Sequence, residues 1–326
     1  MDFDSNLTIQ KRLVKRRKYK FKRTVGIFTL LLIILSIETF LCFNGETMGD
    51  LTNRSVISTM TGTSTNKIVT VSKKIDTSSL KSQLSKYIKG FKGKYGIYYI
   101  NLADGASFGI NDDDQYIAAS TVKIPINLYL FRKIEAGTIN SQNTMTYISK
   151  DYEPGTGILQ YRKQGTKYKI QELSRLSIEY SDNVATNMLI RLLGMSNYKN
   201  FMKQLGGSIV VDRNISCPKD MAIYIKRVYE FSHSNKVLGG QLIKYLENTE
   251  FNDRLPKYLP KSVKVAHKIG NYWGGEWGSA LHDIGIIYTK NPYILAVMSR
   301  NVNEAEAYNV IASISKKVYD FQIKQK

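Results

Sequence analysis

Apolar and polar positions alternate in the early and late parts of residues 75–326, and this period of two predicts strands. Between these parts the apolar residues recur at helical spacing, which predicts a run of helices. The predicted strands cover residues 95–102, 106–110, 263–269, 281–288 and 293–298. The predicted helices cover residues 77–89, 120–136 and 304–321, with several more between residues 170 and 247.

The order of these elements is strands, helices, strands and a last helix, with no internal repeat. It favours an α+β fold in which a mostly antiparallel sheet is built from both ends of the domain, with a helical insert between them. A domain of this length is large enough for one well-packed core.

Residues 25–43 form an apolar run whose only charge is Glu38. Its length is close to the roughly 20 residues that a membrane-spanning helix needs. The preceding residues 1–24 carry nine Lys or Arg and two Asp, a net charge of +7, which predicts a basic cytoplasmic tail. We interpret the run as an uncleaved transmembrane anchor, and a cleaved signal peptide is the alternative.

Residues 44–74 are rich in Ser, Thr, Asn and Gly and have no apolar period, which is typical of a flexible linker. With this topology, residues 75–326 form the extracellular domain. A nucleic-acid-binding arm is not expected at the amino end, because an apolar span follows the basic run immediately.

The whole chain has a net charge of +20 and is 43% hydrophobic, a balance that excludes a disordered chain. Two cysteines exclude a disulfide scaffold, and three histidines without ligand spacing argue against a metal site. We also find no cofactor motif. The positive charge suits an anionic wall polymer or a membrane surface, and solubility alone explains it equally well.

Ser120 and Lys123 form an S-x-x-K at the start of a predicted helix. Residues three apart share one face of a helix, so the lysine amine is expected to approach the serine hydroxyl. Serine becomes a nucleophile when a base takes its proton, and a lysine with a depressed pKa can be that base. The same spacing occurs elsewhere in the chain, so this motif alone is weak.

Two further segments contain polar groups suited to the same chemistry. Ser181-Asp182-Asn183 precedes a helical run and is a rare tripeptide, although a simple helix N-cap also explains it. Lys268-Ile269-Gly270 ends a strand pattern, where a lysine normally faces solvent. The three segments are informative because they occur together and in this order.

Together they resemble the S-x-x-K, S-D-N and K-T-G set of class A β-lactamases and penicillin-binding proteins. The flanking residues 118–125, 180–187 and 282–288 are similar to the same family, and the resemblance covers about residues 78–322. It implies a β-lactamase/transpeptidase-like fold and a serine hydrolase activity.

The resemblance also implies a role for each matching residue. Ser120 is the expected acylated nucleophile, and Lys123 is its base or part of a proton relay. Ser181 is expected to pass the proton to the leaving nitrogen, with Asn183 bracing Lys123 or the substrate amide. Lys268 is expected to hold the substrate carboxylate and to tune Ser181. The backbone N–H groups of Ser120 and of Asn271, which follows Gly270, are the implied oxyanion hole.

The sequence departs from the family pattern at two places. Ile269 replaces the usual Thr or Ser, which removes a hydroxyl for the substrate carboxylate. Residues 206–218 contain no E-x-x-L-N, so the Glu that activates the deacylating water in class A enzymes is missing. Asp212 is the only carboxylate in that segment. We therefore expect slow deacylation and poor β-lactamase turnover.

The leading hypothesis is a membrane-anchored serine hydrolase that forms an acyl-enzyme with β-lactams or cell-wall amides. A D,D-peptidase-like enzyme acting on peptidoglycan stem peptides is the second hypothesis. A noncatalytic wall- or β-lactam-binding module is the third, and the joint presence of Ser120, Lys123, Ser181 and Lys268 argues against it.

Overall fold

The computed structural model describes residues 74–211 and 213–325, which fall within one compact unit spanning residues 69–326. The predicted tail, anchor and most of the linker lie outside the described residues. Among the helices of the described residues, none has the length and apolar character needed to cross a bilayer.

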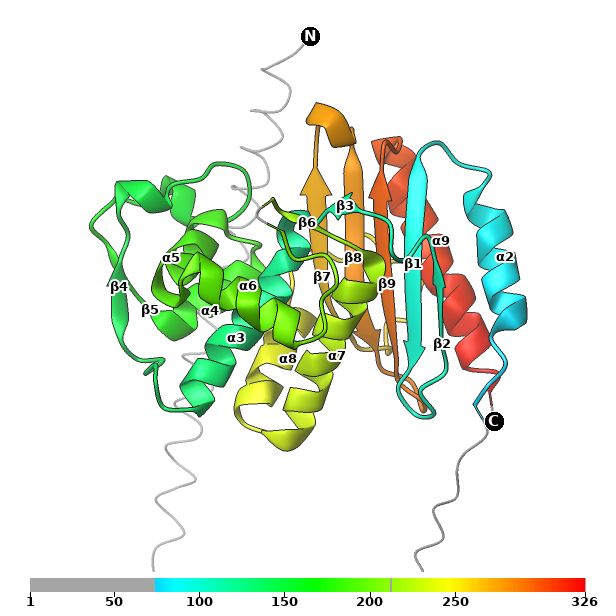
Figure 1. The fold of residues 1–326 in the computed structure, drawn as a ribbon, viewed down its shortest axis with the longest axis horizontal. Helices are drawn as coiled ribbons and strands as arrows, with labels where there is room; N and C mark the ends of the chain where they lie inside the picture. The colour runs from blue at the N-terminus through cyan, green and yellow to red at the C-terminus, as the bar shows by residue number, and fades with distance from the viewer. Residues whose placement is uncertain (1–73, 212, 326) are drawn as a thin grey trace, which may run out of the picture. The chain divides into compact units, whose positions relative to one another are not determined.

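The centre of this unit is a five-stranded antiparallel sheet with the strand order β2-β1-β9-β8-β7 (Figure 1). Its first two strands come from the beginning of the domain and its last three from the end, as the sequence predicts. The strands are β1 (Lys94–Asn101), β2 (Ser107–Ile110), β7 (Val265–Tyr272), β8 (Ala280–Ile287) and β9 (Tyr293–Arg300).

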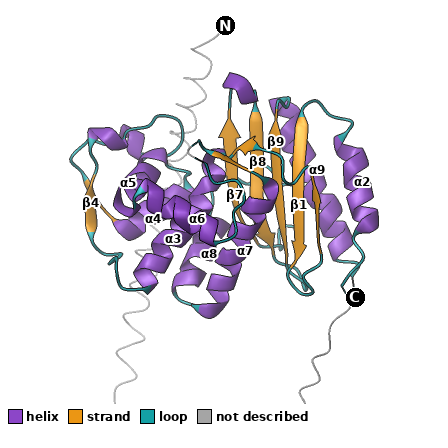
Figure 2. Ribbon diagram, viewed as in Figure 1, coloured by secondary structure: helices purple, strands orange, loops and turns teal. Residues whose placement is uncertain are grey.

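Helices cover both faces of the sheet (Figure 2). The helices α2 (Ser78–Ile88) and α9 (Glu304–Gln322) cover one face, and the inserted helices cover the other. Strand β9 is therefore buried on both faces. Leu295 belongs to the core beneath α2 and α9, and its neighbour Ile294 belongs to the core beneath the insert. Alternate side chains point to opposite faces, so a strand that is buried on both faces loses the polar alternation of an exposed one.

The helical insert lies between β3 and β7 in sequence, and its helices α7 and α8 pack on the sheet. The sequence predicts this region as helical. Its helices are α3 (Lys123–Glu135), α4 (Ile170–Glu179), α5 (Asn183–Leu193), α6 (Met195–Gln204), α7 (Pro218–Ser234) and α8 (Leu238–Glu247).

Two small strand pairs escape the sequence analysis, because strands of two or three residues carry no measurable period. Strand β3 (Tyr116–Ile117) pairs with β6 (Ile215–Ser216), and β4 (Thr144–Thr146) pairs with β5 (Lys167–Lys169). The first pair ties the segment before Ser120 to the segment before α7. Short 3₁₀ turns complete the domain at Ala119–Val122 (η1), Ser149–Asp151 (η2), Leu159–Tyr161 (η3) and Gly275–Trp277 (η4).

The helix predicted to start at Ser120 starts later than expected. Residues Ala119–Val122 form the 3₁₀ turn η1, and the α-helix begins only at Lys123. Ala119 has a positive φ of 49°, and Ser181 has a φ of 53°. Left-handed backbone is costly for residues with a side chain and is concentrated at functional sites. Both strained residues belong to, or directly precede, the motifs predicted to carry the chemistry.

Candidate active site

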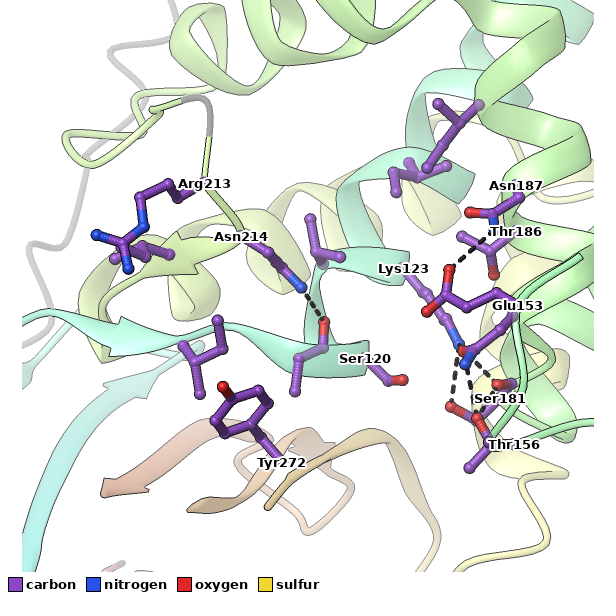
Figure 3. Close-up of a pocket in the computed structure, with 18 of the residues that line it drawn as sticks. Ser120, Lys123, Glu153, Thr156, Ser181, Thr186, Asn187, Arg213, Asn214 and Tyr272 are labelled. Carbon is purple, nitrogen blue, oxygen red and sulfur yellow. Dashed lines mark hydrogen bonds between the residues drawn. The ribbon is translucent and has the colours of Figure 1, made fainter. Parts of the chain in front are cut away.

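The three predicted motifs meet at a single cavity of about 530 Å³ (Figure 3). Ser120 reaches it from η1, Asn183 from the start of α5, and Asn271 from β7. Figure 3 shows Lys123, Ser181 and Thr156 on one side of Ser120, with Tyr272, Asn214 and Arg213 on the other. Segments more than 140 residues apart in the sequence therefore build one site.

Lys123 is held among oxygen atoms although only 4% of its surface is exposed. Its Nζ donates to the carbonyl of Ser181 at 2.6 Å and to Oδ1 of Asn183 at 2.8 Å, and lies 3.3 Å from Oγ of Ser181. Burial lowers the pKa of Lys123 to about 7, although the negative charges of Asp182 and Glu153 oppose this shift. A lysine in this setting is largely neutral just above neutral pH and can accept a proton.

Lys268 approaches the same serine from the sheet. Its Nζ donates to Oγ of Ser181 at 2.9 Å, and its side chain is completely buried. Burial and the positive charge of Lys123 hold the pKa of Lys268 well below its ordinary value, and Asp283 opposes them. Lys268 lies behind Ser181 and not among the described residues that line the cavity. Its predicted contact with the substrate carboxylate therefore stays a prediction.

The hydroxyl of Ser120 forms no hydrogen bond with Lys123 in the described part of the chain, although Figure 3 shows it directed toward the side where Lys123 lies. Lys123 donates instead to Ser181, which lies just before α5, and to Asn183 at the start of α5.

Gly270 allows strand β7 to approach the turn that carries Ser120. A Cβ added there would come within 3.1 Å of both the Ala118 carbonyl and the Thr121 methyl group. Because the two segments approach closely, the residues implied to form the oxyanion hole lie on neighbouring segments. These are Ser120 and Asn271, whose backbone N–H groups are the implied donors. Gly270 itself does not line the cavity.

The sequence analysis did not identify Arg254, which fixes the end of β7. Its guanidinium is buried and donates to the carbonyl of Gly270 at 3.3 Å, to that of His282 at 2.8 Å, and to Oδ1 of Asn271 at 2.6 Å. A buried arginine with carbonyl partners holds these strand ends in register. Its position in a loop, with no motif around it, gave no sequence signal.

Thr156 is a second residue whose role the sequence did not reveal. Its Oγ1 donates to the carbonyl of Ser181 at 2.5 Å and lies 3.3 Å from Oδ1 of Asn183. The same two oxygens accept from Lys123. Thr156 therefore holds both of the acceptors that position the lysine. The sequence signal was the stretch Gly155-Thr156-Gly157-Ile158-Leu159, which is similar to a stretch in members of the family but gave Thr156 no role.

Asp182 fastens the loop that carries Thr156. Its carboxylate accepts from the backbone N–H groups of Ile158 at 2.6 Å and Leu159 at 2.8 Å, and from that of Ala185 at 2.9 Å as the N-cap of α5. Gly157 makes this possible, since its φ is 99° and an added Cβ would lie 2.3 Å from Cα of Asp182. The tripeptide Ser181-Asp182-Asn183 therefore supplies the N-cap of α5 through Asp182 as well as the residues of the predicted catalytic motif.

Glu153 is the one carboxylate among the described lining residues. It is exposed, and its Oε2 accepts from Nδ2 of Asn187 at 2.9 Å. The segment between α6 and α7 lines the cavity with Val210, Val211 and three further residues, none of them acidic: Arg213, Asn214 and Ile215. Asp212, considered above as a substitute for the missing Glu, lies outside the described residues.

In the described residues, no cluster of three or more His, Cys, Asp or Glu side chains is arranged to bind a metal ion. The polar groups at the cavity are hydroxyls, amides, amines, one guanidinium and one carboxylate. This donor set suits proton transfer around a serine nucleophile.

The five-stranded sheet, the helical insert and the serine–lysine site at their junction define a β-lactamase-like serine hydrolase. The family model of the beta-lactamase enzyme family matches residues 79–322, and the chain belongs to that family. Beta-lactamase ROB-1 of Haemophilus influenzae is 25% identical over 256 residues, which cover 70% of this chain and 80% of that protein.

Solved structures agree with this assignment. PBP-A superposes with a TM-score of 0.71 and 27% identity, covering 76% of this chain and 97% of PBP-A. A PBP-A variant solved as an acyl-enzyme complex with penicillin G superposes with a TM-score of 0.70 and 27% identity, over 76% of this chain and 97% of that chain. The predicted fold is confirmed, and the chain is a serine hydrolase of the β-lactamase and penicillin-binding type.

Proposed function

We propose that Ser120 forms a covalent acyl-enzyme with β-lactams and with amides of the bacterial cell wall. The observation that carries this proposal is the pair of buried lysines, Lys123 and Lys268, which both reach the hydroxyl of Ser181 beside Ser120. Burying two amines is costly, and such sites are concentrated where proton transfer is needed.

In the proposed reaction, neutral Lys123 takes the proton of Ser120 while Oγ of Ser120 attacks the amide or β-lactam carbonyl. The carbonyl oxygen becomes an oxyanion, which the backbone N–H groups of Ser120 and Asn271 stabilise. The C–N bond then breaks, and the leaving nitrogen takes a proton from Ser181. Lys123, which holds the proton taken from Ser120, returns it to Oγ of Ser181, while Lys268 keeps its hydrogen bond to that oxygen. Asn183 keeps Lys123 in place throughout.

Hydrolysis of the ester is proposed to be slow with β-lactams. A deacylating water needs a base, and the described residues between α6 and α7 supply no carboxylate to the cavity. Glu153 enters from the opposite side on an exposed loop, so its carboxylate is solvated rather than poised by burial. The penicillin acyl-enzyme of the PBP-A variant, which shares this fold, supports accumulation of such an intermediate.

A D,D-peptidase-like activity on peptidoglycan stem peptides is the second candidate. It is favoured by the similarity to PBP-A and by the missing carboxylate, since a slowly hydrolysed β-lactam adduct is the behaviour of an enzyme whose substrate is a peptide. The noncatalytic binding module is disfavoured, because both lysines contact Ser181 at the cavity that Ser120 also lines.

The proposal is tested by intact-protein mass spectrometry of the full chain after incubation with benzylpenicillin. We expect a long-lived adduct of the mass of the antibiotic on the wild type and none on Ser120→Ala. Rapid loss of penicillin without an adduct would contradict slow deacylation. Neither adduct nor penicillin loss would reject the β-lactam part of the proposal.

We further propose that residues 25–43 anchor the protein in the bacterial cell membrane, with the amino terminus in the cytoplasm and the hydrolase outside. The apolar run and the basic residues before it support this topology. The test is fractionation of cells that express the full chain, combined with intact mass to detect cleavage. Recovery of a shortened, soluble protein would favour the signal-peptide alternative.

A further inference from the structure

The active-site cavity continues beyond the polar groups along an apolar wall. The wall is formed by α3, α5, α6 and the short segment between α6 and α7, and it lines the same 530 Å³ cavity as Ser120. Its residues, called the apolar wall below, are Ile126, Ile190, Met195, Tyr198, Met202, Val210 and Val211. None of them takes part in the proton transfers proposed above.

Three large hydrophobic side chains that line this cavity are exposed. Met195 is 50% exposed and Val211 is 46% exposed, and Trp273, which lines the same cavity, is 54% exposed. Large apolar side chains that gather at one exposed place usually mark a binding surface. A group bound here would lie within reach of Ser120, because one cavity holds both.

The part of the wall between α6 and α7 is fixed in place by a residue of α7. The buried carboxylate of Asp220 accepts from the backbone N–H of Ser208 at 3.0 Å, from its hydroxyl at 2.9 Å, and from the N–H of Ile209 at 2.7 Å. These bonds fix the segment on the first turn of α7. The next residues, Val210 and Val211, then border the cavity without filling it.

We infer that the hydrolase takes amide substrates whose acyl part carries a large apolar group, such as an alkyl chain of six to ten carbons, bound against the apolar wall. The inference rests on the proposed acylation of Ser120 and adds the substrate class. Two properties of the cavity carry it: the polar groups around Ser120 that would hold the reacting carbonyl, and the apolar wall that lines the same cavity. Its volume is that of a typical ligand pocket.

The consequence is a dependence of acylation on chain length. Each methylene that moves from water onto the wall is expected to raise the second-order acylation rate constant about two- to fourfold. The increase should level off once the chain extends beyond the mouth. A site that recognises only the polar core of the substrate would show no such gradient.

The experiment uses the full chain and three penicillins made from 6-aminopenicillanic acid with acetyl, hexanoyl or decanoyl side chains. Adduct formation on Ser120 is followed by intact mass to obtain each rate constant. We expect the decanoyl compound to react at least tenfold faster than the acetyl compound. In the double variant Met195→Ser/Val211→Ser, the ratio of the two rates should fall severalfold. Both residues are about half exposed, so the substitutions are compatible with folding.

The matched control is Val237→Ser, which removes an 80% exposed apolar side chain that does not line the cavity. It should keep the full gradient. Equal rates for all three penicillins would overturn the inference and leave the proposed function standing. An unchanged ratio in the double variant would also overturn it. If no penicillin acylates Ser120, the proposed function fails and the inference fails with it.

Discussion

The amine nitrogen of Lys268 lies 2.9 Å from the hydroxyl oxygen of Ser181. Lys268 belongs to β7, an edge strand of the five-stranded sheet, and Ser181 belongs to the helical insert, 87 residues earlier. This contact links the sheet to the insert at the point where Lys123 also arrives. Both lysines therefore contact the hydroxyl of Ser181, which lies on the proposed path of the proton.

Replacing Ser181 with alanine should therefore interrupt proton delivery to the leaving nitrogen. We expect the rate of penicillin acylation to fall by about 10²-fold or more, the usual scale for general acid–base catalysis. Ser216→Ala is the matched control, since Ser216 is also a buried serine but its hydroxyl has no hydrogen-bond partner. Rapid acylation by Ser181→Ala, measured by intact mass, would remove Ser181 from the mechanism.

The acylation rate should rise with pH through about 7 and then level off. Lys123 has a pKa of about 7 because it is buried, and only its neutral form accepts the proton of Ser120. The rate constant measured between pH 5 and pH 9 tests this. A rate that falls as pH rises across this range would show that Lys123 does not act as the base.

Replacing Glu153 with glutamine should move that pH midpoint to lower values. The negative charge of Glu153 raises the pKa of Lys123, so its removal favours the neutral amine. Glu172→Gln, an exposed substitution on α4, is the control that should leave the midpoint in place. A midpoint that moves upward in Glu153→Gln would contradict the electrostatic argument.

The substitution Asn183→Asp should raise the pKa of Lys123, whereas Glu153→Gln should lower it. Oδ1 of Asn183 accepts from Nζ of Lys123 at 2.8 Å, and a carboxylate at this distance should raise the lysine pKa by about one to three units. Acylation at pH 7 should slow and recover at higher pH. Asn183→Leu, which removes the acceptor without adding charge, should stay slow at every pH.

Gly157→Ala should destabilise the protein and slow acylation. Gly157 has a φ of 99°, and its added Cβ would meet Asp182 at 2.3 Å, which disturbs the loop carrying Thr156. Gly165→Ala is a close control, because Gly165 has a φ of 90° but nothing lies within 4 Å of its added Cβ. Backbone strain of about 1–2 kcal/mol is common to both variants, and thermal unfolding should show a larger loss in Gly157→Ala.

The buried Lys123 should also reduce stability in a pH-dependent way. Its pKa is about 7 in the folded protein against an ordinary value of 10.5, so unfolding takes up a proton between these values and stability falls as pH decreases. Relative to wild type, Lys123→Met should gain about 1.4 kcal/mol in the free energy of unfolding per pH unit from pH 10 to pH 7. Urea unfolding measures this gain, and Lys244→Met, an exposed lysine on α8, should show none.

The sequence by itself determined the sheet strands, the helical insert and the residues of the three motifs. The periods of two and of 3.6 residues are local properties, so β1 and α9 could be predicted from their own residues. The three motifs that contain Ser120, Ser181 and Lys268 were sufficient to identify the family, because they occur together and in the order typical of it. The absence of an E-x-x-L-N glutamate between α6 and α7 was also visible in the sequence.

Only the tertiary structure decided how these groups meet. Lys123 was expected to approach Ser120 because they share a turn, yet its hydrogen bonds go to Ser181 and Asn183, which come from a different segment. Thr156 and Arg254 carry no motif, and their roles come from long-range contacts with Ser181 and Asn271. Burial, which depresses the pKa of both lysines, is likewise a property of the packed fold and not of local sequence.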